Sequence, residues 1–178
     1  MSKISVAKTV WFFGLPGAGK STLADAIHGR FVEWSIAATR LDGDLLRQRL
    51  NSDLGFSGAD RRENIRRAAE VARLFNQAGM TVVASFISPR RCDRQMARDI
   101  IGPARLIEVF VDAPLAVCEA RDPKGLYRRA RAGHVQAFTG VSAEFEPPEG
   151  VDLRVDSAAT RVDEAVALLA QALLPMMM

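Results

Sequence analysis

The chain has 178 residues, 48% of them apolar, which is enough for one domain with a buried core and short for two. Its apolar runs stay below the roughly 20 residues that cross a bilayer, and its start, "MSKISVAK", is unlike a signal peptide, so we expect a cytoplasmic protein without a membrane partner. The net charge of +3 comes from basic residues spread along the chain without a basic arm, which argues against nucleic acid as a partner.

Short β-rich runs alternate with helical patterns along the chain. The predicted strands are Val10–Phe13, Ala37–Leu41, Thr81–Phe86, Leu106–Val111 and Leu153–Val155, and the predicted helices lie at about 19–29, 44–50, 60–78, 89–100, 114–120 and 163–174. This alternation predicts an α/β fold with a five-stranded parallel sheet covered by helices on both faces. We expect residues 1–178 to form a single domain in which the loose stretch at about 122–150 is a mobile lid.

The stretch "GLPGAGKST" lies between the first predicted strand and the first predicted helix, and it fits the phosphate-loop pattern G-x-x-x-x-G-K-[ST]. Its glycines let backbone N–H groups turn inward around phosphates, and the helix N-terminus adds partial positive charge. Lys20 is expected to reach the β- and γ-phosphates, and Ser21 is expected to ligate Mg²⁺. No N/T-K-x-D guanine reader is present, which favours ATP. The residues expected to bind ATP are Gly14, Leu15, Pro16, Gly17, Ala18, Gly19, Lys20, Ser21 and Thr22.

Polar residues follow the second and third predicted strands, at the sheet edge where ligands bind in parallel α/β folds. The run "RLDGD" places Asp42 and Asp44 there. One carboxylate could orient the water shell of a metal ion, and the other could accept a proton from an attacking hydroxyl. A structural alternative is that Asp44 caps the next helix. Ser88 lies before a proline that can start a helix, and it suits a helix cap, a substrate contact or, with least support, a nucleophile.

The predicted helix at 60–78 begins with an unusual set of polar residues. Its first two turns carry Arg61, Asn64, Arg66 and Arg67. Basic residues at a helix N-terminus oppose the helix dipole, so the cluster predicts a nearby anion. Arg47 and Phe56 lie just upstream, and the Phe56 ring is suited to stacking on a base.

The blocks "GLPGAGKST", "LDGD", "DLGFS", "DRRENIRR", "SFISP", "VFVDAPLAVCEARDPKGLYRRARAG" and "FTGV", in this order, resemble adenylylsulfate (APS) kinase. They span about residues 10–141, and "ENIRR", "FISP" and "RDPKGLY…FTG" in series are far more specific than a phosphate loop alone. The resemblance implies a P-loop NTPase fold and transfer of the ATP γ-phosphate to the 3′-hydroxyl of APS, giving 3′-phosphoadenylyl sulfate (PAPS) for sulfate assimilation. It also implies a homodimer and functional coupling to ATP sulfurylase.

The resemblance further implies roles for particular residues. Ser21 and Asp42 match the Mg²⁺ site, and Asp44 matches the acid at the 3′-hydroxyl. The positions implied to bind APS are Asp44, Arg47, Phe56, Arg61, Asn64, Ile87, Ser88, Lys124, Phe138 and Thr139, and those implied in catalysis are Lys20, Asp42, Asp44 and Ser88. Ser88 matches a serine traditionally labelled a phosphoserine intermediate, but direct in-line transfer needs no covalent step when a metal and two carboxylates are present.

The stretch Leu45–Arg49 departs from the family, which usually has Asn-Val-Arg-His-Gly after the second acid. This departure supports an alternative reading as a kinase of the same fold that acts on another small hydroxyl acceptor, such as a sugar or nucleoside. The intact "ENIRR" and "FISP" blocks argue against that alternative. A third reading is a non-catalytic nucleotide-binding module, against which the retention of both Asp42 and Asp44 argues, since binding alone does not need both acids.

Overall fold

The apolar runs of the sequence form one parallel sheet in the computed structural model, which describes residues 7–177. Its five strands lie in the order β2–β3–β1–β4–β5. The strands are β1 (Thr9–Phe13), β2 (Ala38–Asp42), β3 (Thr81–Ser85), β4 (Leu106–Asp112) and β5 (Leu153–Asp156). Each pairing is parallel, which confirms the predicted α/β class and the predicted sheet.

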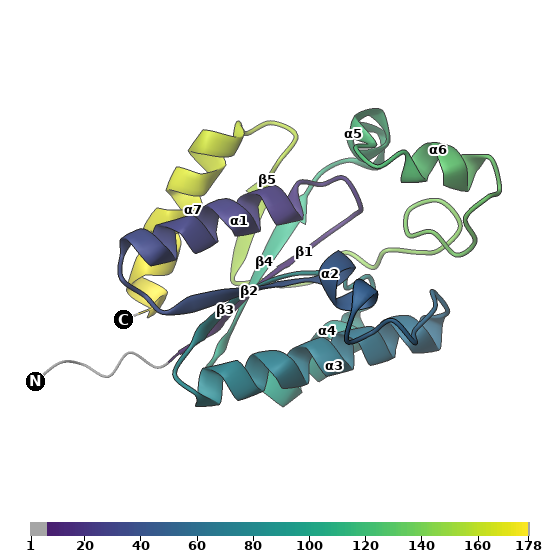
Figure 1. Cartoon of the computed structure of the whole chain (residues 1–178). Coiled ribbons are helices and arrows are strands. Elements are labelled where there is room, and N and C mark those ends of the chain that lie inside the picture. Colours follow the sequence, from purple (N-terminus) through teal and green to yellow (C-terminus); the bar gives the residue numbers. More distant parts are fainter. Residues whose placement is uncertain (1–6, 178) are drawn as a thin grey trace, which may run out of the picture.

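Helices cover both faces of this sheet (Figure 1). Helices α1 (Lys20–Glu33) and α7 (Val162–Met177) pack together on one face, and α3 (Gly58–Gln77) and α4 (Arg91–Ile101) pack together on the other. Three short helices follow the carboxyl ends of strands: α2 (Gly43–Gln48) after β2, then α5 (Leu115–Arg121) and α6 (Leu126–Arg131) after β4. None of the helices within residues 7–177 is long and apolar enough to cross a membrane.

Strand β1 lies at the centre of the sheet, and all of its residues are buried. Successive side chains of a strand point to opposite faces, so β1 contributes to two apolar layers. Val10 and Phe12 belong to the layer that contains residues of α1 and α7, whereas Trp11 and Phe13 belong to the layer that contains residues of α3 and α4. The loop that follows β1 is therefore held in place by the core of the molecule.

Three local predictions about helices differ from the structure, and the first concerns α1, which continues to Glu33, four residues beyond the predicted end at about 29. Pro89 does not start α4, because the chain stays extended at Arg90 and the helix begins at Arg91. The segment at 122–150 contains helix α6, where the sequence predicted only a loose stretch. Helix α6 begins after Gly125, whose backbone is left-handed (φ 63°), and the carboxylate of Asp122 accepts hydrogen bonds from the first-turn amides of Tyr127 and Arg128.

Candidate active site

A cleft of about 840 Å³ opens at the carboxyl edge of the sheet. The phosphate loop, α2, the start of α3, the residues after β3 and parts of the segment 121–139 form its walls. The sequence-predicted site residues that line it are Pro16, Gly17, Ala18, Gly19, Lys20, Ser21, Thr22, Asp42, Asp44, Arg47, Phe56, Arg61, Asn64, Ile87, Ser88, Lys124, Phe138 and Thr139. Gly14 and Leu15 are not among the residues that line the cleft. The fold thus brings residues from distant parts of the chain to one site.

The phosphate loop leaves β1 through a glycine that no other residue could replace without strain. Gly14 has a φ of +148°, and a Cβ built on it would lie 2.4 Å from the carbonyl oxygen of Val111. Gly19 is also left-handed (φ 97°) and forms the N-cap of α1. The Nζ of Lys20 donates to the carbonyl oxygen of Leu15 at 2.7 Å, and burial lowers the pKa of Lys20 to about 8. A phosphate in the loop would offer this buried ammonium a charged partner.

Asp42 is the centre of a hydrogen-bonded group at the end of β2. Its Oδ2 accepts from Ser85 Oγ at 2.8 Å and from Ser21 Oγ at 3.0 Å, while the Nη2 of Arg40 lies 3.7 Å away. Burial raises the pKa of Asp42, but the hydrogen bonds from Ser85, the Asp44 amide and Ser21, together with the charge of Arg40, outweigh it, so the pKa lies below its ordinary value. Asp42 is therefore an ionised carboxylate beside the Ser21 hydroxyl, and this pair of oxygen ligands suits a hard divalent cation.

The N-cap of α2 is Asp42, which corrects the alternative that Asp44 caps this helix. Asp42 Oδ1 accepts from the backbone N–H of Asp44 at 2.9 Å. The Asp44 carboxylate is left to face the cleft, where Lys124 Nζ donates to its Oδ2. Both side chains of this pair are about three-fifths exposed. Asp44 is thus positioned by the backbone while its oxygens remain accessible.

The segment that carries Lys124 also meets α3 across the cleft. Arg61 donates to Thr139 Oγ1 and to the carbonyl oxygen of Ala137, and its Nε donates to the carbonyl oxygen of Phe56 at 3.0 Å. The guanidinium carbon of Arg47 lies 4.6 Å from the centroid of the exposed Phe56 ring. Two arginines and a lysine therefore line the cleft beside Asp44, Phe56 and Thr139.

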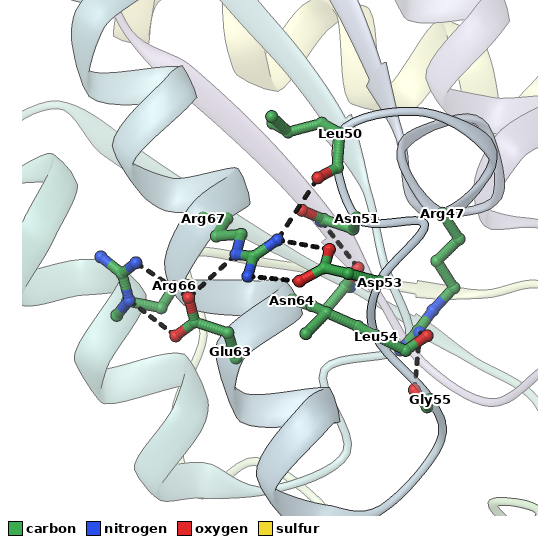
Figure 2. A network of polar contacts seen from close by, with 10 residues as sticks. All are labelled: Arg47, Leu50, Asn51, Asp53, Leu54, Gly55, Glu63, Asn64, Arg66 and Arg67. Carbon is green, nitrogen blue, oxygen red and sulfur yellow. Dashed lines mark hydrogen bonds and ion pairs between the residues drawn. The ribbon is translucent and has the colours of Figure 1, made fainter.

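The basic cluster predicted at the start of α3 divides into two groups. Arg61 and Asn64 line the cleft, whereas Arg66 and Arg67 do not. Arg66 forms two hydrogen bonds with Glu63, and Arg67 pairs with Glu63 and, through two hydrogen bonds, with Asp53 (Figure 2). The prediction of an anion near the whole cluster is wrong for these two arginines, because acids of the chain itself neutralise them.

Ser88 is almost fully buried, at 1% exposure, and its backbone is left-handed (φ 44°). Its Oγ accepts from Trp11 Nε1 at 3.0 Å, and its carbonyl oxygen accepts from Arg94 Nη1 at 2.8 Å. The indole N–H is a neutral donor that takes up a lone pair of the hydroxyl and does not increase its nucleophilicity. This environment favours a contact role for Ser88 over a nucleophilic one.

Several residues of the site were missed by sequence reasoning. Ser85, which holds Asp42, lies opposite it in the register of β2 and β3, so a correct strand pairing could have revealed it. Tyr127 OH donates to the carbonyl oxygen of Pro16 at 2.9 Å, and Ser157 Oγ donates to that of Ala18 at 2.7 Å, so both support the phosphate loop. Arg121 also lines the cleft and lies within the "RDPKGLY" block, although the sequence suggested no role for it, and further lining residues outside the quoted blocks are Ser157, Thr160, Val162 and Ala165.

Comparisons with known proteins identify relatives of this chain. The family model described as adenylylsulphate kinase matches residues 6–156. The adenylyl-sulfate kinase of Erwinia tasmaniensis is 54% identical over 147 residues, which cover 83% of this chain and 73% of that protein. The APS kinase CysC of Mycobacterium tuberculosis, solved in complex with AMPPNP and APS, superposes with a TM-score of 0.90 at 45% identity and covers 94% of this chain and 97% of its own.

A more distant structure shares only the fold. The gluconokinase of Sinorhizobium meliloti superposes with a TM-score of 0.64 at 20% identity, covering 97% of this chain and 94% of its own. The fold is thus shared with a protein named for a different acceptor, so the fold alone does not identify the acceptor.

Proposed function

Because the chain belongs to the adenylylsulphate kinase family, we propose that its cleft transfers the γ-phosphate of ATP to the 3′-hydroxyl of APS, releasing ADP and PAPS. The observation that carries this proposal is the convergence in one cleft of a phosphate loop, the acids Asp42 and Asp44, and the cations Arg47, Arg61 and Lys124. These cations suit a doubly anionic acceptor such as APS, because arginine and lysine form charge-assisted hydrogen bonds with phosphate and sulfate oxygens.

The nucleotide side of the cleft is proposed to hold ATP. Backbone N–H groups of the part of the loop that lines the cleft, residues 17–22, surround the phosphates, and Lys20 exchanges its bond to the Leu15 carbonyl for the β- and γ-phosphate oxygens. The cleft is also lined by the side chains of Thr160, Val162 and Ala165, which supply a surface for the adenine ring of ATP.

Ser21 and Asp42 are the residues that would hold Mg²⁺. Their oxygens already lie 3.0 Å apart, and Asp42 is ionised. Within residues 7–177 no cluster of three or more His, Cys, Asp or Glu side chains offers a complete cage, and Mg²⁺ usually takes one or two protein ligands together with phosphate oxygens and water. The ion, when bound, supplies charge neutralisation at the phosphates.

Asp44 is proposed as the base that accepts the proton of the 3′-hydroxyl. For this it must leave Lys124, which then turns to the phosphosulfate of APS together with Arg47 and Arg61. The remaining acceptor contacts are proposed for Phe56, Asn64, Ile87, Ser88, Phe138 and Thr139. Transfer is direct and in line, since the Ser88 hydroxyl is buried against Trp11 and, within residues 7–177, has no activating base as a hydrogen-bond partner. The segment 122–150 acts as a lid that excludes water from the reacting groups.

The test is product analysis after the protein is mixed with MgATP and APS, with ADP and PAPS resolved by chromatography. We expect equal amounts of the two products. ADP without PAPS, or no turnover, would contradict the proposal, and turnover with a sugar or nucleoside in a panel of acceptors would then identify the alternative kinase.

We further propose, on family resemblance, that the protein is cytoplasmic, forms a homodimer and works together with an ATP sulfurylase. Light scattering of the purified protein measures its molar mass in solution and so tests the homodimer. A mixture of the protein with a sulfurylase, ATP and sulfate, in which PAPS forms without added APS, measures the functional coupling.

A further inference from the structure

Asn51 and Asn64 face each other between the connector 49–57 and helix α3 (Figure 2). Asn51 is fully buried, and Asn64 is 5% exposed. The Nδ2 of Asn51 donates to the Oδ1 of Asn64 at 2.9 Å. Asn64 also lines the cleft, whereas Asn51 does not. The buried amide therefore lies directly behind a residue of the proposed acceptor site.

The connector does not need the Asn51 side chain for its shape. The backbone N–H of Asn51 donates to the Leu46 carbonyl at 2.8 Å, and its own carbonyl accepts from the Leu54 N–H at 3.1 Å. Arg67 fastens the connector to α3 through Asp53 and the carbonyl oxygen of Leu50. These contacts hold both ends of the turn around Asn51.

The Asn51 side chain carries a cost that a purely structural role leaves unexplained. Its Oδ1 is buried and has no hydrogen-bond partner among the residues that the structure describes. A buried acceptor without a partner is unfavourable, and an apolar side chain of similar size would avoid the penalty. The amide must therefore supply something that an apolar residue cannot, and within residues 7–177 its side-chain hydrogen bond is to Asn64.

That hydrogen bond determines which end of the Asn64 amide faces the cleft. Because Oδ1 of Asn64 accepts from Asn51, its Nδ2 is left to donate into the cleft. If the Asn64 amide turned over while Asn51 kept its orientation, its Nδ2 would meet the Nδ2 of Asn51, so two donors would face each other. We propose that Asn51 is a positioning residue that fixes Asn64 as a hydrogen-bond donor toward an acceptor atom of APS.

This inference rests on the proposed function, and a double-mutant cycle tests it. The variants are Asn51→Ala, Asn64→Ala and the double variant, with KM measured separately for APS and ATP. We expect Asn51→Ala to raise KM for APS about fivefold, the size of one lost hydrogen bond, while KM for ATP stays unchanged. The double variant should be no worse toward APS than Asn64→Ala, because Asn51 acts only through Asn64.

Asn76→Ala is the matched control, because Asn76 is a buried asparagine at the other end of α3. It is 2% exposed, and its amide bonds to Thr9 Oγ1 and to the Met80 carbonyl. This variant should lower the melting temperature without changing KM for APS. If Asn51→Ala proves too unstable to assay, the cycle is built with Asn51→Leu, which fills a similar volume and cannot donate.

Two results would overturn the inference. Independent effects of Asn51 and Asn64 on KM for APS would assign Asn51 a structural role, and so would equal increases in KM for APS and ATP. Failure of the proposed function is distinguishable, because the wild-type protein would then make no PAPS. In that case the wild-type protein has no KM for APS with which the variants could be compared.

Discussion

The two sides of the cleft are built in different ways. The phosphate loop follows a strand with every residue buried, and Gly14 lies against the backbone of β4. The acceptor side is held by side chains near the surface, such as the pair of Arg67 and Asp53, which are 27% and 58% exposed. Exposed ion pairs contribute at most about 1 kcal/mol each. Substitutions on the nucleotide side should therefore affect folding, whereas those on the acceptor side should affect one substrate.

The largest effect that we expect is on the acceptor side, from Asp44→Asn. The amide cannot accept the proton of the hydroxyl, so kcat should fall about 10²- to 10⁴-fold, while the dissociation constant for ATP remains nearly unchanged. Steady-state assays and ATP titrations measure the two quantities. Asp163→Asn, an exposed acid in the first turn of α7, is the control. Near-normal turnover of Asp44→Asn would rule out its role as the base.

On the nucleotide side, Gly14→Ala tests whether the stability of the fold depends on the close approach of Gly14 to the backbone of β4. Its Cβ would lie 2.4 Å from the Val111 carbonyl oxygen, at a φ of +148°. We expect the free energy of unfolding to fall by roughly 3 kcal/mol, measured by urea denaturation. Gly79→Ala is the control, since Gly79 also has a positive φ (+82°) but open space around it, and it should cost only about 1 kcal/mol. Equal losses would mean that the close approach to β4 is unimportant.

Arg61→Ala tests whether a substitution on the acceptor side weakens the binding of APS without weakening that of ATP. Loss of the charged donors should raise KM for APS about thirtyfold and leave KM for ATP within experimental error. Arg66→Ala is the control, because Arg66 lies on the same helix but pairs with Glu63 away from the cleft. Equal weakening of APS and ATP by Arg61→Ala would remove Arg61 from the acceptor side.

The pH dependence of ATP binding should reveal the burial of Lys20. Burial lowers the pKa of Lys20 to about 8, below its ordinary value of 10.5. Bound phosphates favour the charged form and raise this pKa, so above pH 8 binding takes up a proton, and ATP affinity should fall about tenfold per pH unit. Below pH 8 the affinity should be constant. Calorimetry in two buffers of different ionisation enthalpy measures the uptake, which Lys20→Arg should abolish. Binding without proton uptake at pH 9 would contradict this prediction.

The smallest effect should come from Ser88→Ala. Direct transfer needs no hydroxyl there, so we expect kcat/KM for APS to fall about threefold, for the loss of one neutral contact. Mass spectrometry of the wild-type protein under turnover should detect no phosphoserine. Complete loss of activity, with phosphoserine trapped in the wild type, would instead support a covalent route.

The sequence predicts the sheet well because each strand is a short apolar run bounded by helical patterns. Helix α6 escapes prediction for a physical reason: it is short, it follows a left-handed glycine, and it lies among glycines and prolines that favour loops. Its start depends on the carboxylate of Asp122, whose role appears only when the chain is folded.

The candidate site is predictable where its residues belong to local motifs, as Lys20 and Asp44 do. Ser85 and Tyr127 were missed because their contacts depend on strand register and on chain segments that are distant in sequence. Arg61 and Arg67 look alike in sequence, and only the fold separates the one in the cleft from the one paired with acids. Local spacing therefore finds groups that bind phosphate, and tertiary packing decides which supporting groups hold them.

The central place of β1 in the sheet has a consequence for the order in which the protein can form during synthesis. Strand β1 leaves the ribosome before the other four strands of this sheet, yet its neighbours are β3 and β4 and not the next strand made. The carbonyl group packed against Gly14 belongs to Val111, near the end of β4. A nascent chain that stops before β4 lacks one wall of the phosphate loop. Capture of ATP is therefore expected only after that strand has emerged.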